Sequence, residues 1–138
     1  MNKEDVFTVI KKNPTFFLGT SENDTPHVRV ITLFRADENG LIFATGKHKN
    51  LYRQLMGNPR VELLFWLARQ DTQIRINGAA EPFEDLETKK LVVEKFTFLK
   101  PWIEKEGYDQ LAPFCITNAE AYIWSKSAEL KQKEYVRL

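Results

Sequence analysis

The stretch HVRVITLFRADENGLIFATGKHKNLYRQLMGNPRVELLFW, residues 27–66, decides how this chain folds and what it can bind. Two strand-like runs are joined by the turn signal Asp37–Gly40, and they lead into a basic turn, Thr45–Asn50, that opens a short amphipathic helix. Unpaired backbone N–H groups and the positive end of the helix dipole favour an anion at such a helix start. Lys47 and Lys49 add charge at the same place, so the segment predicts an anion site that suits a phosphate.

Composition narrows the class of protein. The chain has 138 residues, 43% hydrophobic and 28% charged, which is ordinary for one globular domain with its own core. Lys and Arg together exceed Asp and Glu by one, so the sequence lacks the broad basic field of a nucleic-acid-binding protein. No apolar run has the length of a signal peptide or of a membrane span. We expect a soluble, cytoplasmic protein that binds neither nucleic acid nor membranes.

Hydrophobic periodicity predicts the strands and helices. Six strands are expected, at residues 15–21, 27–35, 41–45, 61–68, 72–83 and 111–124, and helices at 3–12, 50–56, 86–95 and 102–106. Gly78, inside the fifth strand, predicts a bulge or a close backbone approach. Most strands follow one another through hairpins, which favours a small antiparallel barrel with helices at its ends, an α+β fold. We expect one domain over residues 1–138, with polar residues 125–138 as a tail or a partner-docking arm.

Few side chains suggest catalysis by themselves. Cys115 is the only cysteine, and its apolar strand favours a buried thiol over a nucleophile. His27 and His48 lack a carboxylate cluster at ligand spacing, so no metal site is predicted, and His48 fits a solvated turn as well as an anion site. Arg29 and Arg75 interrupt apolar strands, where each must reach solvent or meet an anion. No catalytic acid or base is identified.

Four segments in order and in register resemble a known family. They are VRVITLF at Val28–Phe34, LIFAT at Leu41–Thr45, NPRVELLFW at Asn58–Trp66 and QIRINGAAE at Gln73–Glu81. Together they are similar to the pyridoxamine 5'-phosphate oxidase-like family of FMN-binding split barrels, over roughly residues 5–125. The resemblance implies a six-stranded antiparallel split β-barrel that forms a homodimer, with two FMN sites at the subunit interface.

The resemblance also implies which residues hold FMN. The isoalloxazine and ribityl chain would lie along Arg29, Val30, Ile31, Thr32, Leu33 and Phe34. Ala44 and Thr45 would approach the phosphate, and Gln73 would reach the flavin ring from the opposite subunit. Oxidases of the family place a basic pair where this chain has Asn50 and Leu51, so we expect Lys47 and Lys49, beside Asn50, to take over the phosphate.

The family's chemistry implies an oxidoreductase in which the flavin carries hydride or electrons. The segment with which true oxidases grip the pyridoxine substrate is not recognised after Trp124, so vitamin B6 oxidation is disfavoured. The KHKNLYRQL pattern is more similar to the small nitroimidazole-resistance (NimC/NimA-type) branch, which implies reduction of a nitro compound or another small electron acceptor. Two alternatives stay open: a protein that binds flavin, haem or another planar ligand for storage or sensing, and a structural dimer that has lost its cofactor.

Overall fold

The computed structural model describes residues 1–128 and 133–138. Within these residues eight strands form one antiparallel sheet: β1 (Thr15–Glu22), β2 (Thr25–Thr32), β3 (Arg35–Asp37), β4 (Gly40–Gly46), β5 (Arg60–Leu67), β6 (Thr72–Pro82), β7 (Leu111–Ser125) and β8 (Tyr135–Arg137). Their order across the sheet is β2-β1-β5-β6-β7-β4-β3, and β8 pairs with β7. The expected antiparallel α+β fold is confirmed, and the two strands beyond the six expected are three residues long each.

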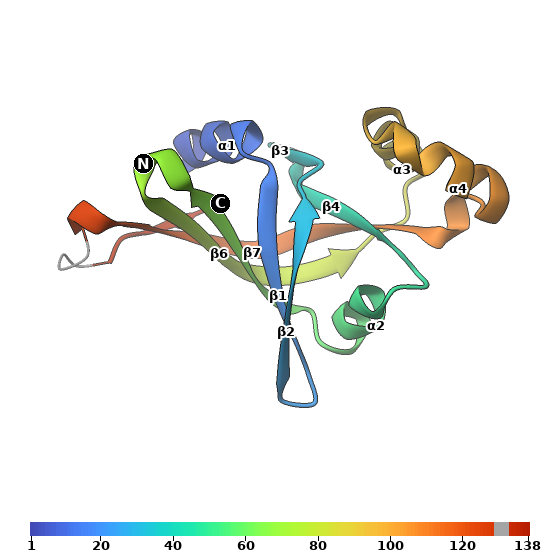
Figure 1. The fold of residues 1–138 in the computed structure, drawn as a ribbon, viewed down its shortest axis with the longest axis horizontal. Helices are drawn as coiled ribbons and strands as arrows, with labels where there is room; N and C mark the ends of the chain where they lie inside the picture. The colour runs from blue at the N-terminus through green and yellow to red at the C-terminus, as the bar shows by residue number, and fades with distance from the viewer. Residues whose placement is uncertain (129–132) are drawn as a thin grey trace.

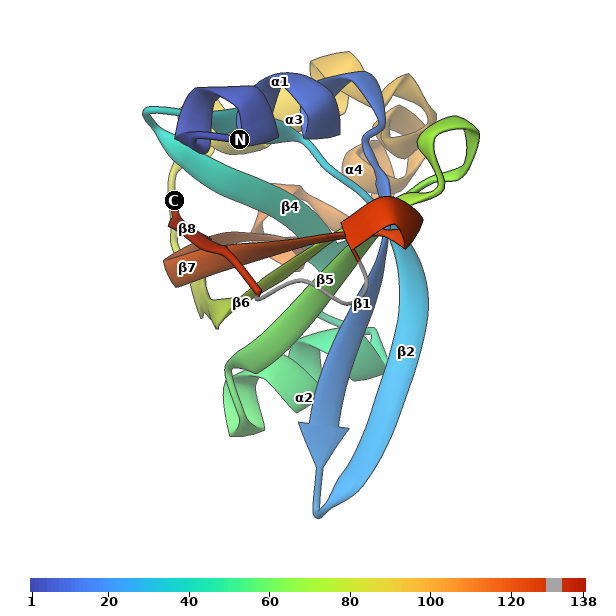
Figure 2. The ribbon, with the colours of Figure 1, turned by 90° about the vertical axis from the view of Figure 1, so that its left-hand side faces the viewer.

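The helices are α1 (Lys3–Lys12), α2 (Asn50–Gly57), α3 (Leu86–Lys95) and α4 (Lys100–Glu106), with short 3-10 turns η1 (Ala68–Gln70), η2 (Thr97–Leu99), η3 (Tyr108–Gln110) and η4 (Lys126–Ala128). Helices α3 and α4 lie together to one side of the strands (Figure 1). Helices α1 and α2 lie on opposite sides of the crossing strands (Figure 2). None of the helices in the described residues is long and apolar enough to span a membrane.

Local sequence signals explain where two of the helices begin. At the start of α1, the Asn2 side chain accepts from the Asp5 N–H at 2.8 Å and the Asp5 carboxylate accepts from the Asn2 N–H at 3.0 Å, which is a capping box. At the start of α3, the Asp85 carboxylate accepts from the N–H of Thr88 at 3.3 Å and from its hydroxyl at 2.6 Å. These caps satisfy backbone donors that a helix start otherwise leaves without partners.

The expected strand over residues 27–35 is two strands, because the chain changes partners at Leu33 and Phe34. The Leu33 N–H donates to the Pro14 carbonyl at 2.8 Å, next to β1, and the Phe34 N–H donates to the Ile42 carbonyl at 2.9 Å, on β4. Strands β2 and β3 therefore lie at the two ends of the strand path, and the described strands do not close into a complete barrel. Because of this change of partner, the end of β2 lies near β4.

Gly78 marks a bulge in β6, as its position in the strand pattern predicts. The pairing of β6 with β7 shifts register between Asn77 and Ala79. A Cβ atom on Gly78 would lie 2.8 Å from the Thr117 carbonyl oxygen and 2.7 Å from Cγ2 of Ile116. A side chain has no room there, so the close approach of the two strands requires glycine.

A strand occupies the end of the expected polar tail. Residues Tyr135–Arg137 pair with β7, and the side chains of Val136 and Leu138 pack against the hydrophobic core. Burial of these two apolar side chains favours pairing over a solvated arm. Of the expected tail, residues 125–138, only 129–132 lie outside the described residues.

The larger hydrophobic cluster, here called the main cluster, lies between the sheet and helices α1 and α2. Its largest side chains are four phenylalanines that are at most 1% exposed: Phe16, Phe43, Phe65 and Phe114. The rings of Phe16 and Phe65 lie with their centroids 5.0 Å apart. Side chains of Ile10 on α1 and Leu55 on α2 complete the packing, so both helices are fixed to the sheet.

A second and smaller cluster, here called the helical cluster, joins α3 and α4 to the other part of the sheet. Its buried members are Phe34, Ile42, Val92, Val93, Ile103 and Leu111. Partly buried side chains, among them Ala44, Phe96 and Trp102, pack against it. Both clusters contain residues of β4, so this strand connects the two halves of the molecule.

Candidate functional site

A cavity of about 410 Å³ lies between the strands β2 and β4 and the helical segment from α3 to α4. Its lining residues are Val30, Ile31, Thr32, Ala44, Thr45, Gly46, His48, Lys49, Val92, Phe96, Phe98, Leu99, Trp102 and Leu111. An apolar wall with a few polar groups at one end is the usual character of a ligand site. A groove of about 480 Å³ between α3 and α4 is bordered mainly by exposed lysine and glutamate side chains, and it lacks this character.

The strand side of the cavity contains five of the residues predicted from the sequence. Val30, Ile31 and Thr32 come from the end of β2, and Ala44 and Thr45 come from the end of β4. The change of partner after β2 places these two strand ends beside one cavity. Six of the twelve predicted residues, these five and Lys49, line the same space.

The polar end of the cavity is the turn between β4 and α2. Lys49 is the residue before the first turn of α2, and within the described residues no side chain caps this helix. Its first-turn N–H groups and the exposed Lys49 side chain lie at the cavity edge. A Cβ on Gly46 would lie 2.6 Å from Cε1 of His48, so glycine leaves room for this imidazole beside the cavity. The arrangement suits an anionic group.

The helical side of the cavity is apolar and aromatic. Phe96, Phe98, Leu99 and Trp102 come from the end of α3, from η2 and from α4. The Trp102 ring lies 5.6 Å from the His48 ring, centroid to centroid, so the helical side and the polar turn are in contact. This wall was not predicted from the sequence. The closely spaced aromatics from residue 96 to residue 102 were the available signal, but they are equally typical of a core.

Lys47 is not among the residues that line the cavity, and it takes part in an ion-pair cluster. Its Nζ lies 3.4 Å from Oε1 of Glu84, and Oε2 of Glu84 accepts from Lys89 Nζ at 2.6 Å. Lys89 is only 2% exposed, and it also donates to the Tyr108 carbonyl at 3.1 Å. The hydrogen bond from Lys89, with the charges of both lysines, lowers the pKa of Glu84 from its ordinary value. The cluster fastens the basic turn to α3 and to the chain after α4.

Arg29 is not a lining residue of the cavity, and its guanidinium connects β1 to α2. Its guanidinium donates to the Thr20 hydroxyl at 2.7 Å, to the Leu18 carbonyl at 3.3 Å and to the Gln54 side-chain oxygen. Thr20 also donates to the Gln54 oxygen at 2.7 Å, and both of these side chains are buried. Burial lowers the pKa of Arg29. In contrast Arg75, on β6, reaches the surface and pairs with Glu62 at 2.6 Å.

The remaining predicted residues lie around the cavity or apart from it. Leu33 and Phe34 are buried, at 2% and 9% exposure, and belong to the two hydrophobic clusters. Asn50 is exposed in the first turn of α2 and accepts from Arg53 at 2.9 Å. Gln73 lies on β6, between the two strands that carry Trp66 and Trp124, and does not line the cavity of its own chain.

An exposed apolar surface adjoins the cavity. Phe17 pairs with Val30 on one side and with Leu64 on the other, so the three side chains share one face of the sheet. Val28, Val30, Phe17 and Trp66 are 70%, 57%, 42% and 44% exposed. Val30 belongs both to this face and to the cavity lining, so the cavity opens beside the exposed face.

Comparisons with known proteins agree with this fold. The chain is 31% identical over 114 residues to the pyridoxine/pyridoxamine 5'-phosphate oxidase of Escherichia coli O1:K1. The match covers 81% of this chain and 49% of that protein, so the chain spans about half the length of the curated relative.

Two solved structures cover nearly all of the chain. A NimC/NimA family protein from Clostridium acetobutylicum is 25% identical with a TM-score of 0.79, over 99% of this chain and 93% of that one. General stress protein 26 from Bacillus anthracis is 25% identical with a TM-score of 0.71, over 99% and 98% of the two chains. The family model of pyridoxamine 5'-phosphate oxidase matches residues 3–122. The chain therefore belongs to the pyridoxamine 5'-phosphate oxidase family.

Proposed function

We propose that this protein binds FMN in the cavity between β2, β4 and the α3–α4 segment, and that it reduces a nitro compound or another small electron acceptor. Proteins of the family bind flavin. The observation that carries the proposal is a cavity of about 410 Å³ with an uncapped helix start at one end and an apolar wall at the other. FMN has the same two parts, a phosphate and a flat ring system.

The polar end suits the phosphate. The first-turn N–H groups of α2, the Thr45 hydroxyl and the Lys49 ammonium lie at this end, and Asn50 and Lys47 stand beside it. Because Lys47 pairs with Glu84 at 3.4 Å, its charge is partly neutralised, so Lys49 is the main cation for the phosphate in this proposal.

The strand side suits the ring and the ribityl chain. Backbone and side-chain groups of Val30, Ile31, Thr32 and Ala44 border the apolar part of the cavity. Three predicted residues outside the lining support the site indirectly in this proposal. Arg29 holds α2 against β1, and the buried side chains of Leu33 and Phe34 fix the end of β2. Rigid strands thus hold the site, which lowers the entropy lost on binding.

We further propose that two copies pair through the exposed apolar face. This face exposes Phe17, Val28, Val30 and Trp66, which are costly to leave in water, and the register places the Glu62–Arg75 ion pair on the same face. Gln73 lies on a strand of this sheet but outside the cavity of its own chain. In a dimer it can reach the flavin of the partner, which fits the role that the family resemblance implies for it.

When bound and reduced, a flavin supplies a hydride. Hydride plus one proton from solvent converts a nitro group into a nitroso group and one water, which balances the two electrons and both hydrogens. The chain's own part is to bind and orient the acceptor and to exclude water at the apolar wall. Since no carboxylate occurs among the described lining residues, solvent or the His48 imidazole is the available proton source.

Titration with FMN tests the proposal. Wild-type protein freed of ligand should quench FMN fluorescence and gain thermal stability, and Lys49→Ala should weaken FMN binding about tenfold or more, as expected for one charged hydrogen bond. Lys12→Ala, an exposed lysine on α1, should leave FMN affinity unchanged. Wild-type protein that neither quenches nor is stabilised would overturn the proposal and favour a structural dimer without cofactor.

A second candidate is a protein that stores or senses flavin, haem or another planar ligand without turnover. The described cavity lining favours it in one respect, since it holds one histidine and no carboxylate to move protons. The two functions differ in one measurement. After dithionite reduction of the loaded protein, an enzyme reoxidises with a nitroaromatic acceptor faster than free FMN does, and a storage protein reoxidises more slowly.

A further inference from the structure

Three cationic side chains lie beside the start of α2, and carboxylates hold two of them. Lys47 Nζ lies 3.4 Å from Oε1 of Glu84. Arg53 donates to both carboxylate oxygens of Glu22, at 3.0 and 3.1 Å. The third side chain, Lys49, makes no ion pair within the described residues. Part of the positive charge near the polar end of the cavity is therefore neutralised before a ligand binds.

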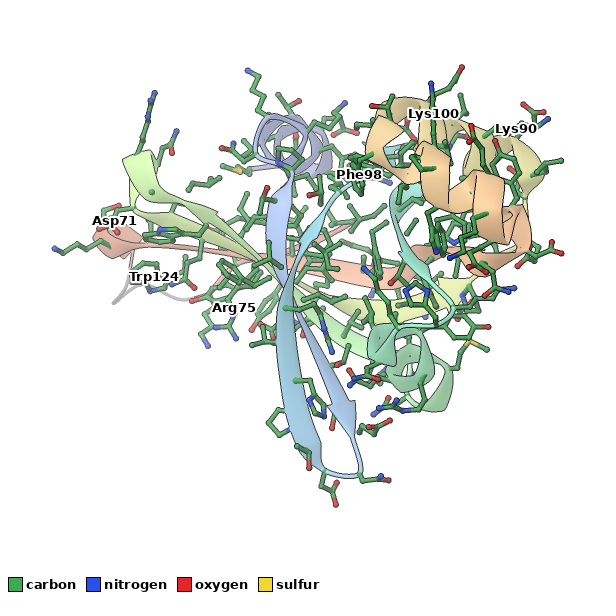
Figure 3. The ribbon with its side chains drawn as sticks, turned by 45° about the vertical axis from the view of Figure 1, so that its right-hand side comes forward. Asp71, Arg75, Lys90, Phe98, Lys100 and Trp124 are labelled. Atoms are coloured by element: carbon green, nitrogen blue, oxygen red, sulfur yellow. The ribbon has the colours of Figure 1, made fainter. Side chains whose placement is uncertain are left out.

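A buried lysine holds the Glu84 carboxylate in place. Lys89 on α3 is 2% exposed, and its ammonium donates to Oε2 of Glu84 at 2.6 Å and to the Tyr108 carbonyl at 3.1 Å. The next residue, Lys90, extends outward from α3, away from the strands (Figure 3). A buried ammonium is costly without a charged partner, so Lys89 keeps Glu84 within reach of Lys47.

The backbone of the basic turn has anchors other than Glu84. The Lys47 N–H donates to the Gln110 carbonyl at 2.9 Å, and the Lys49 N–H donates to the Gly46 carbonyl at 3.0 Å. Gly46 and Lys49 line the cavity, whereas Lys47, between them in the sequence, does not. The contact with Glu84 therefore acts on the Lys47 side chain, on its direction and its charge, while backbone hydrogen bonds hold the turn.

We propose that Glu84 is a positioning residue that limits the affinity of the site for phosphate, because it keeps the Lys47 ammonium in an ion pair. The inference rests on the proposed function, since the phosphate is that of FMN. The two oxygens of Glu84 serve two lysines, Oε1 for Lys47 and Oε2 for Lys89. A glutamine has one acceptor oxygen, which the buried Lys89 needs. Without the carboxylate, Lys47 is available to an anion at the start of α2.

FMN and riboflavin are the matched ligands that test the inference, since they differ only in the phosphate. Each is titrated into ligand-free protein at pH 7, and quenching of flavin fluorescence gives the dissociation constant. Glu84→Gln should bind FMN about 2- to 5-fold more tightly than wild type, as release of one partly exposed ion pair predicts. Its affinity for riboflavin should equal that of wild type. The gain for FMN should shrink at high salt, because ions screen the released charge.

A double variant assigns the gain to Lys47. Lys47→Ala should cost more FMN affinity in the Glu84→Gln background than in the wild-type background, because only the first background leaves the ammonium available. Glu81→Gln removes an exposed carboxylate outside the ion-pair cluster, so it is the matched control and should leave the affinity for both flavins unchanged. Circular dichroism of each variant shows whether it is folded.

The outcomes separate the inference from the function on which it rests. Unchanged or weaker FMN binding by Glu84→Gln overturns the inference and leaves the proposed function intact. An equal change for FMN and riboflavin, or a Glu84→Gln protein that does not fold, also overturns it, because either result assigns Glu84 to holding the structure. Failure of the wild-type protein to bind FMN overturns both.

Discussion

The two sides of the cavity differ in how they are built and in what they contribute. The strand side is part of a continuous antiparallel sheet over the main cluster, in which Phe16, Phe43, Phe65 and Phe114 are at most 1% exposed. The helical side rests on the smaller helical cluster and presents Phe98 at 77% exposure. The sheet thus fixes the geometry of the strand side and contains most of the larger buried cluster. The helical segment supplies the chemical character of the wall.

This difference separates stability from binding within one small protein. A change on the strand side should lower the free energy of unfolding, because it removes packing or hydrogen bonds of the core. A change on the exposed helical wall should alter binding while the fold persists. The same type of substitution, made once on each side, tests whether stability and binding are divided in this way.

The largest contrast is expected for phenylalanine-to-alanine changes. Phe65→Ala empties a fully buried position against Phe16, and it should lower the free energy of unfolding by about 3–5 kcal/mol. Phe98→Ala should change it by less than about 0.5 kcal/mol, because most of that side chain is in water. Urea unfolding followed by circular dichroism measures both. A loss of more than about 2 kcal/mol in Phe98→Ala would show that the helical wall is part of the core.

The next contrast compares Arg29 on β2 with Arg75 on β6. Arg29→Met removes hydrogen bonds to the buried Thr20 and Gln54, so it should cost about 2–3 kcal/mol of stability. Arg75→Met removes an exposed ion pair with Glu62 and should cost less than about 1 kcal/mol. Equal losses from the two variants in urea unfolding would mean that the Arg29 contacts do not hold α2 against β1.

The smallest contrast concerns the ion-pair cluster that joins the two sides. In the folded protein the pKa of Glu84 lies below its ordinary value of 4.5, chiefly because Lys89 donates to it. Its contribution to stability is therefore complete above about pH 4.5 and is lost as pH falls through the lowered folded pKa. Glu84→Gln should cost about 1 kcal/mol at pH 7, since the carboxylate is exposed and the amide oxygen still accepts from Lys89.

Unfolding of wild type and Glu84→Gln at pH 7 and at pH 3 measures this contribution. The difference between the two proteins should shrink at the lower pH. A difference that stays constant would show that the ionised Glu84 does not stabilise the fold. Glu81→Gln, at an exposed carboxylate on β6 that takes no part in the ion-pair cluster, serves as the control for the substitution itself.

The strand side could be predicted from the sequence because its signals are local. Alternation identified β2, and the strand-like run after the Asp37–Gly40 turn identified β4. The Thr45–Asn50 turn identified the start of α2, and Gly78 identified the bulge. The change of partner at Leu33 and Phe34 could not be predicted, because it depends on which strand lies next to each backbone N–H. Alternation along the chain is the same whether a strand continues or moves to another neighbour.

The helical side was missed for a similar reason. The bounds of α3 agreed with the expected 86–95, but the pattern does not reveal whether Phe98 and Trp102 face a core or a cavity. The interaction partners of charged residues also lie far away in the sequence, so the local pattern does not predict them. Lys47 meets Glu84 and Arg29 meets Gln54 across long stretches of chain, so their engagement in the fold appears only in three dimensions.

The visible absorbance spectrum of the purified protein, followed by release and identification of any chromophore, shows whether the protein holds FMN. We predict the absorbance of a bound flavin, and release of FMN from the protein on denaturation. Lys49→Ala prepared in parallel should carry less of it. A colourless protein that also fails to take up added FMN, or a protein that releases haem in place of flavin, would contradict the account.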